Sequence, residues 1–475
     1  MIDLLQWPVI GPLLRWRHAR TSLQLVLLAA AALVVTHGLF GPQTAPANLA
    51  TVATWIHYRG LLVLALLAAG NVFCTGCPFV LVRDAGRRLH APARRWPRIV
   101  RTKWIGIALF ATVLFVYEWF DLWALPRATA LLIVGYFASA LLVDVVFKGA
   151  TFCKYLCPIG QYNFIASTLS PLEVRARDVE RCRTCATVDC IKGRRSAAAP
   201  ALVLQRGCEL ALFLPAKVGN LDCTFCLDCV HACPHDNVAI GGRMPGVELW
   251  DGRRRSGIGR LVRRPDIAAL AAVFVFGALV NAFAMTSPSY AAQHWIASAS
   301  GVTAEWALLA LMFGGALVGV PALVFGVASA ATKALAGDQS TTLRRVGTEY
   351  AMALVPFGLG VWVAHYLFHF LTGLFTIVPV AQSAAFDLTR HAILGEPAWR
   401  WIGFRPGTVY PIQIGFILLG TVGSLAAAYR ISEREYPARA TAAAAPWLVT
   451  TMALAMVALW ILNQPMEMRA LGLAG

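Results

Sequence analysis

Long apolar stretches separated by short polar segments dominate this chain from one end to the other. About nine stretches are long enough to cross a bilayer as helices, at positions 22–40, 54–73, 104–122, 128–147, 267–285, 306–328, 350–378, 410–429 and 447–462. In the seventh stretch, Pro356 and several glycines predict a kinked or broken helix. The pattern predicts an all-α polytopic membrane protein with a four-helix region at 1–165, an insertion at 166–264 and a five-helix region at 265–475.

Composition and charge agree with a membrane protein. Hydrophobic residues make up 58% of the 475 residues, charged residues only 14%, and the mean hydropathy is +0.63, which is too apolar for a soluble protein of this length. The formal net charge of +17 comes from Lys and Arg at 15–20, 83–103, 175–195, 253–264, 333–345 and 430–439.

These basic segments lie beside the apolar stretches, as the positive-inside rule requires. They predict a bacterial inner (cytoplasmic) membrane protein with its N-terminus and residues 166–264 in the cytoplasm and its C-terminus on the periplasmic side. A pI of 9.7 would also suit a nucleic-acid-binding surface. No groove-reading motif accompanies it, so we expect no nucleic-acid partner.

Twelve cysteines fall between Cys74 and Cys233. The densest run has the C-x2-C-x2-C-x3-C-P spacing of bacterial ferredoxins, in which three thiolates hold one cubane and the fourth crosses to a second; it consists of Cys223, Cys226, Cys229 and Cys233. Three further ligands come from Cys182, Cys185 and Cys190, so Cys233 would complete their cluster. Cys208 remains to complete the first cluster. The spacing predicts two [4Fe–4S] clusters in a cytoplasmic ferredoxin-like module, whereas the alternative, a disulfide framework, suits short secreted chains.

Two more cysteine pairs, each followed by proline, end the second helix and follow the fourth: Cys74 and Cys77 with Pro78, and Cys153 and Cys157 with Pro158. In these pairs and the module that follows them, the chain resembles the NapH- and NosR-like polyferredoxin membrane proteins of nitrate and nitrous oxide reductase systems, and the related copper-reducing CcoG-like proteins. The resemblance covers about residues 55–240 and implies an iron–sulfur electron-transfer protein with a partner reductase. The first pair is one residue shorter than the usual pattern of that family, and the helices after Arg264 match nothing in it.

The four cysteines of these pairs leave several interpretations open. Together they could hold a third cluster or a single metal ion, because four thiolates make a complete soft-metal shell. They could also be packed structural thiols or a redox-active disulfide.

Ionisable residues at membrane depth mark candidate sites for a second redox partner. We expect His57 and Arg59 at the start of the second helix, and Glu118 and Asp121 at the end of the third, to lie at the outer side. There they could bind a quinone and accept its protons, or simply reach the lipid headgroups.

In the seventh helix, His365 and His369 are four residues apart and share one face. They could bind b-type haem, copper or a quinol head group, with His37 as a candidate partner, or belong to the core. Near the C-terminus, the thioethers of Met466 and Met468 would suit copper(I) or fill gaps. No Walker loop or C-x-x-C-H motif occurs, so we expect neither nucleotide hydrolysis nor covalent haem.

Three functions fit these features. The chain could be an electron-transfer subunit of a quinol-linked membrane oxidoreductase, passing electrons between the quinone pool or a cytoplasmic donor and a partner reductase. It could instead be a copper-reducing accessory protein, or a transporter that senses redox state. The ferredoxin spacing favours the first, because it is the most specific signal in the sequence.

Overall fold

A computed structural model describes residues 3–90, 92–196, 198 and 203–465. Contacts divide the chain into two compact units, each assembled from separate segments. Unit 1 comprises Met1–Ala29, Ala65–Gly106 and Phe137–Ile267, and unit 2 comprises Ala30–Leu64, Ile107–Tyr136 and Ala268–Gly475. The three-part division expected from the sequence follows different boundaries and stays a prediction.

Among the described residues, eight helices are long and apolar enough to span a membrane: Ala19–Phe40, Leu49–Ala69, Pro126–Val146, Pro265–Phe283, Glu305–Ala336, Leu343–Thr372, Pro406–Glu435 and Pro437–Leu462. A shorter apolar helix, Trp104–Trp119, lies where the third span was predicted. The prediction of a mostly helical polytopic membrane protein is therefore confirmed.

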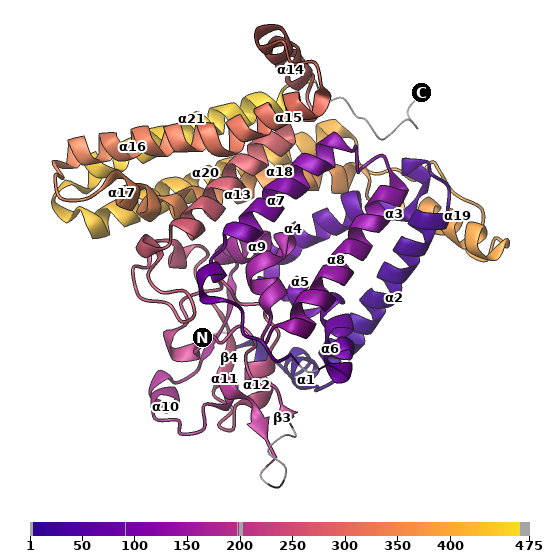
Figure 1. Ribbon diagram of the computed structural model, residues 1–475, viewed down its shortest axis with the longest axis horizontal. Coiled ribbons are helices and arrows are strands. Elements are labelled where there is room, and N and C mark those ends of the chain that lie inside the picture. The colour runs from indigo at the N-terminus through magenta and orange to yellow at the C-terminus, as the bar shows by residue number, and fades with distance from the viewer. Residues whose placement is uncertain (1–2, 91, 197, 199–202, 466–475) are drawn as a thin grey trace. The chain divides into compact units, whose positions relative to one another are not determined.

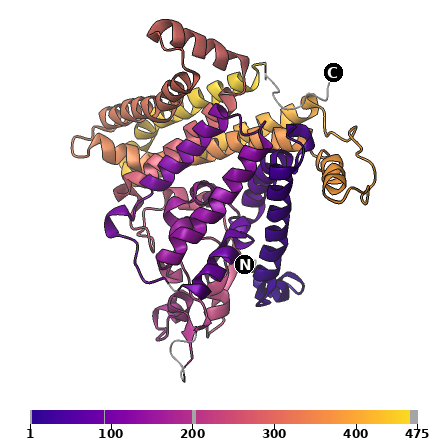
Figure 2. The same cartoon turned by 45° about the vertical axis from the view of Figure 1, so that its right-hand side comes forward.

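Five helices pass from one unit into the other: α2 (Ala19–Phe40), α4 (Arg59–Ala69), α7 (Trp104–Trp119), α8 (Pro126–Val146) and α13 (Pro265–Phe283). Unit 2 also contains α3 (Leu49–Thr51), α14 (Ser287–Ser300), α15 (Glu305–Gly314), α16 (Val320–Ala336), α17 (Leu343–Tyr350), α18 (Val355–Thr372), α19 (Ile377–Thr389), α20 (Pro406–Glu435) and α21 (Ala440–Leu462). The long helices α16, α20 and α21 lie side by side in Figure 1, and the turned view in Figure 2 shows the same bundle.

Glycines allow α18 and α20 to pack closely. A Cβ atom on Gly360 would lie 2.5 Å from the Phe416 carbonyl oxygen, and one on Gly420 would lie 2.5 Å from the Pro356 carbonyl oxygen. Small residues permit such backbone contact between helices in a membrane. The predicted break is also present, because a 3₁₀ turn at Ala351–Leu354 precedes α18 and Pro356 occupies the first turn of that helix.

Unit 1 is built from short elements: α1 (Ile10–Arg15), α5 (Val72–Thr75), α6 (Phe79–Leu89), α9 (Pro158–Ala166), α10 (Val179–Arg183), α11 (Asp189–Lys192), α12 (Asp228–Ala232), β1 (Leu172–Ala176), β2 (Arg194–Arg195), β3 (Val203–Gln205) and β4 (Val238–Gly242). β1 pairs antiparallel with β4, with Leu172 opposite Gly242, and β2 pairs antiparallel with β3. The β1–β4 ribbon thus encloses, in sequence, the eight cysteines from Cys182 to Cys233.

Three π-helical segments interrupt longer helical stretches, at Val52–Tyr58, Phe152–Leu156 and Gly315–Gly319. Such segments are rare and occur often at functional sites. The first contains His57 and the second contains Cys153, both singled out by the sequence.

Candidate functional site

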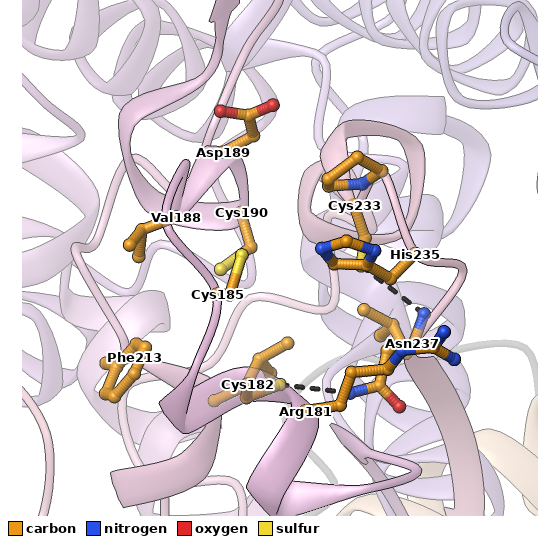
Figure 3. A pocket seen from close by; sticks show the side chains of 13 residues that line it. Arg181, Cys182, Cys185, Val188, Asp189, Cys190, Phe213, Cys233, His235 and Asn237 are labelled. Carbon is orange, nitrogen blue, oxygen red and sulfur yellow. Dashed lines mark hydrogen bonds between the residues drawn. The ribbon is translucent and has the colours of Figure 1, made fainter.

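Four cysteines of unit 1 surround one small cavity, and we call them tetrad A: Cys182, Cys185, Cys190 and Cys233. Figure 3 shows their side chains around this space, together with Phe213 and Asn237. Cys182 lies in α10, Cys190 in α11, and Cys233 caps the end of α12. Asn237 donates its side-chain N–H to the Cys182 sulfur at 3.2 Å and its backbone N–H to the Cys233 sulfur at 3.3 Å. The structure therefore gathers the four residues that the sequence assigned to one cluster.

The donor set of tetrad A consists of four sulfur atoms, the ligands that soft metal ions and iron–sulfur clusters prefer. Burial raises the pKa of Cys190 to about 11, and the neighbouring Cys182 and Cys233 thiolates add to the increase, so four sulfur anions here need a positive partner. A single zinc ion would hold its sulfurs about 2.3 Å from the metal. No group of three or more His, Cys, Asp or Glu in the described part of the chain lies close enough for that. A cubane binds each thiolate to a separate iron and so accepts wider spacing.

The next four cysteines, tetrad B, also come together: Cys208, Cys223, Cys226 and Cys229. Burial raises the pKa of the Cys229 thiol, and the charges of Cys223 and Cys208 raise it further. The backbone N–H of Cys208 donates to the Cys190 carbonyl at 2.8 Å, so tetrad B directly adjoins the ligand loop of tetrad A.

Strained backbone shapes both ligand loops in the same way. Val188 has φ of 52° directly before α11, and Leu227 has φ of 60° directly before α12. Positive φ is a genuine outlier for a β-branched residue such as valine and persists only where the surroundings enforce it. In each case an aspartate and then a cysteine follow, so the two loops form a short internal repeat. The Asp-Cys pair in each loop was the signal for this repeat in the sequence.

The two helix-end pairs form tetrad C: Cys74, Cys77, Cys153 and Cys157. Burial raises the pKa of Cys74 to about 12, and the Cys77 thiolate contributes to the increase. The Cys157 sulfur accepts the Gly160 N–H at 3.3 Å, and the Cys74 sulfur accepts the Asn163 side-chain N–H at 3.5 Å. The structure thus brings the two pairs close enough for their charges to interact. Whether they bind a metal or a cluster stays a prediction.

Hydrogen bonds connect tetrad C to tetrad B. Asn71 donates to the Cys223 carbonyl at 3.0 Å, and the Thr75 hydroxyl donates to the Phe225 carbonyl at 2.6 Å. The three tetrads therefore follow one another within unit 1 in the order A, B, C.

Buried charges beside the tetrads were not singled out in the sequence. Arg83 is 2% exposed and binds both carboxylate oxygens of Glu209, at 2.6 and 3.1 Å. Lys103 binds Asp222 at 2.6 Å. Glu209 and Asp222 each adjoin a cysteine of tetrad B, and that adjacency was the signal available in the sequence.

Unit 2 contains a separate cavity of about 530 Å³. Its wall includes Arg59, whose guanidinium carbon lies 4.3 Å from the ring centres of Trp55 and Tyr117 and 5.0 Å from that of Tyr366. His369 also lines the cavity.

Two imidazole nitrogens in α18 lack a hydrogen-bond partner among the described residues, and one of them belongs to His369 of the cavity wall. The rings of His365 and His369 are 5.0 Å apart, and the Nε2 atoms of both are buried without a hydrogen-bond partner among the described residues. Buried polar atoms usually have partners, so this pair calls for an explanation.

The structure separates the other predicted candidates from this cavity. Both ring nitrogens of His57 lie within 3.2 Å of backbone carbonyls, those of Val52 and Leu374. Glu118 and Asp121 are outside the wall, so of the four quinone candidates Arg59 is the one that faces the cavity.

The three histidines that the sequence singled out for a b-type haem, His37, His365 and His369, are not arranged so that two of them could hold one haem. His37 accepts the Leu49 N–H through Nδ1 at 3.1 Å, and its Nε2 lies 3.2 Å from Asp387. His365 and His369 lie one turn apart on one face, so they cannot reach opposite faces of one haem. Met466 and Met468 lie outside the described residues.

Comparison with known proteins supports the cysteine motifs. The chain is 26% identical over 201 residues to "Ferredoxin-type protein NapH" of Escherichia coli (strain K12), in a match covering 38% of this chain and 66% of NapH. It is 31% identical over 96 residues to "Putative electron transport protein YccM" of the same organism, covering 20% of this chain and 23% of YccM. The resemblance to NapH-like polyferredoxins is confirmed. The chain spans just under two thirds of NapH and about a quarter of YccM. No family model matches the chain, and no solved structure matches it.

Proposed function

We propose that this chain is a membrane-bound iron–sulfur electron-transfer protein, in which tetrads A and B each hold a [4Fe–4S] cluster. The observation that carries the proposal is the grouping of all twelve cysteines into three tetrads joined by hydrogen bonds. The printed descriptions of NapH as a ferredoxin-type protein and of YccM as an electron transport protein support the same chemistry.

The residues around the tetrads would hold the clusters and set their potentials. When bound, the clusters supply one-electron transfer. Donors to the ligand sulfurs, such as the two N–H groups of Asn237, favour the more negative, reduced state and so raise the potential. The charge of the buried Arg83 favours the thiolate forms of Cys77 and Cys153 and so reduces the cost of placing these thiolates together.

The cavity of unit 2 is our candidate for a quinol site. Oxidation of a quinol to a quinone releases two electrons and two protons. Arg59 can donate a hydrogen bond to an oxygen of the head group, and the unpartnered Nε2 of His369 can accept a proton. The apolar wall, which includes Val52, Ile402 and Phe404, suits the ring and its tail. Electrons from the quinol would then pass to a partner reductase. In the alternative route, the electrons for that reductase come from a cytoplasmic donor.

Metal analysis of single-cysteine variants tests the cluster assignment. We expect about eight iron and eight acid-labile sulfide per chain if tetrads A and B are filled, and about twelve of each if tetrad C also holds a cubane. The variants Cys185→Ser, Cys226→Ser and Cys74→Ser remove one ligand from A, B and C in turn. EPR of the reduced protein should show one signal lost or changed at a time. A wild-type protein that holds a single cluster would contradict the assignment.

A copper-reducing function remains the second candidate, because the Nε2 atoms of His365 and His369 are unpartnered. Copper should then co-purify with the protein at about one ion per chain and disappear in His365→Ala. Wild-type protein that binds no copper(I) in equilibrium dialysis would exclude this function.

We place residues 166–264 on the cytoplasmic side on the basis of the positive-inside rule. Reporter fusions after α21 and inside this segment test the proposal. Alkaline phosphatase should be active at the first position and inactive at the second, and the reverse result would invert the topology.

A further inference from the structure

Exposed cations lie in the segment of the chain that carries three cysteines of tetrad A, Cys182, Cys185 and Cys190. Between Arg177 and Arg195 the chain carries six Lys or Arg and three Asp or Glu. Two of these acids are engaged locally, because Asp178 accepts backbone N–H groups at the start of α10 and Glu180 pairs with Arg183. Three exposed cations of this segment form no ion pair with any residue that the structure describes: Arg181, Lys192 and Arg194. Arg181 also lines the cavity of tetrad A. We call these three cations the basic rim.

Membrane sorting does not account for the basic rim. The positive-inside rule counts charges within about 20 residues of the ends of spanning helices. The nearest spans end at Val146 and begin at Pro265. The segment that carries the basic rim lies beyond that distance from both. Residues 175–195 were counted in the sequence among the basic segments beside spanning helices, but their charge needs a different explanation.

Tetrad A is also the tetrad whose ligand loop reaches solvent. The residues on either side of Cys185, Thr184 and Ala186, are exposed. In the matching loop of tetrad B, Phe225 and Leu227, on either side of Cys226, are both buried, and Thr224 is half-buried. An electron that enters or leaves unit 1 from solution therefore has its shortest route at Cys185.

We infer that the basic rim docks an acidic, soluble one-electron carrier protein, which exchanges electrons with the protein at tetrad A. The inference rests on the proposed function and names the partner class for one of its sites. One electron passes between the carrier and the group that tetrad A holds, and no bond forms or breaks. Complementary charge raises the rate of encounter by about tenfold to a thousandfold at low salt, which is what a transient electron-transfer partner needs.

Stopped-flow reduction of the full-length protein tests this inference. The protein would be placed in nanodiscs of uncharged phosphatidylcholine lipid and mixed with chemically reduced flavodoxin, an acidic carrier, while cluster absorbance is followed. The test variant is Lys192→Glu/Arg194→Glu, and the control, with the same change in charge, is Arg95→Glu/Arg98→Glu, two exposed arginines of unit 1 outside this segment.

For the wild type, the second-order rate constant should fall about tenfold or more between low and high salt. The test variant should react about tenfold more slowly at low salt and lose most of this salt dependence, and the control should stay within about twofold of wild type. With cytochrome c, a basic carrier, the same test variant should react faster than wild type.

Each of the remaining outcomes contradicts either the proposed function or the docking surface. EPR signals missing from the wild type would contradict the proposed function itself. Intact EPR signals with an unchanged flavodoxin rate in the test variant would contradict the docking surface alone. The same unchanged rate with lost binding to phosphatidylglycerol vesicles would assign the basic rim to a lipid surface and also overturn the inference.

Discussion

The two units hold their buried and half-buried cations differently. In unit 1, buried charges are paired, with Arg83 held by Glu209 and Lys103 by Asp222. In unit 2, the half-buried Arg59 places its guanidinium among aromatic rings. Both units also bury polar atoms that have no partner among the described residues, such as Asn220 Oδ1 in unit 1 and the Nε2 atoms of His365 and His369 in unit 2. A cation paired with a carboxylate fixes a structure, whereas a cation held by aromatic rings keeps N–H donors for a ligand that comes and goes. The contrast agrees with permanent cofactors in unit 1 and an exchangeable substrate in unit 2.

Backbone conformation shows the same division. Of the described non-glycine residues with positive φ, six lie in unit 1 and two lie in unit 2. Three of the six, Asp222, Phe225 and Leu227, directly adjoin cysteines of tetrad B. The loops of unit 1 therefore adopt strained backbone conformations around the cysteines, whereas the helices of unit 2 contain few such residues.

The strongest test of paired charge in unit 1 is Arg83→Met. Removing this side chain leaves Glu209 and Asp84 partly buried without their main cation, which should lower the free energy of unfolding by about 3–5 kcal/mol. The control is Arg253→Met, because Arg253 is 77% exposed and its pair with Asp251 should contribute at most about 1 kcal/mol. Thermal unfolding in detergent measures both. Equal losses for the two variants would remove the distinction drawn for unit 1.

In unit 2, Arg59→Leu tests whether the guanidinium serves a ligand. A hydrogen bond from a charged donor contributes about 1.5–3 kcal/mol, so the quinol-dependent rate should fall about tenfold to a hundredfold. Iron and sulfide content should not change, because Arg59 belongs to unit 2 and all cysteines to unit 1. Arg59→Lys keeps the charge but loses the planar fork that stacks on Trp55 and Tyr117, so an intermediate rate is expected. A wild-type rate in Arg59→Leu would limit Arg59 to packing.

The sequence predicted unit 1 better than unit 2 for a physical reason. Cluster ligands follow fixed local spacings, so the sequence alone assigned tetrads A and B to two clusters and paired the cysteines of tetrad C, whose role it left open. The cavity of unit 2 takes its wall from residues between Ala45 and Pro406 that share no local pattern. His57 was chosen because it is ionisable, but within the π-helical segment Val52–Tyr58 its ring points to backbone carbonyls. Side-chain direction of that kind depends on tertiary packing, which residue type does not reveal.

A smaller effect should separate the two histidines of α18 from ordinary core. His369→Ala should raise the apparent KM for quinol about tenfold, because the cavity loses one polar contact of about 1–1.5 kcal/mol. His365→Ala should have a weaker effect, because His365 acts through its neighbour. The exposed His294 provides the control as His294→Ala. No visible haem band should appear in any of the proteins, and a sharp α-band in the wild type would contradict our exclusion of a two-histidine haem.

The smallest effect concerns an acid that unit 2 holds without a cation. Asp338, between α16 and α17, accepts N–H groups from Ser340 at 2.8 Å and Thr341 at 3.1 Å, and hydroxyls from Thr341 and Tyr436. The Thr341 hydroxyl and these N–H groups hold the pKa of Asp338 well below its usual range. A lowered pKa stabilises the fold above the unfolded value of about 3.9, and this contribution is lost as pH falls towards the folded value.

Asp338→Asn should therefore lower the free energy of unfolding by about 1 kcal/mol between about pH 5 and pH 8, and the difference from wild type should shrink below about pH 4. Asp84 of unit 1 has a lowered pKa for another reason, because Arg83 and Arg206 outweigh the effect of burial. Added salt should thus weaken the contribution of Asp84 and leave that of Asp338 nearly unchanged. Thermal unfolding of Asp338→Asn and Asp84→Asn at low and high salt measures this, with Glu305→Gln, an exposed acid, as the control. Equal salt dependence in the two variants would show that the units do not differ in how they hold acids.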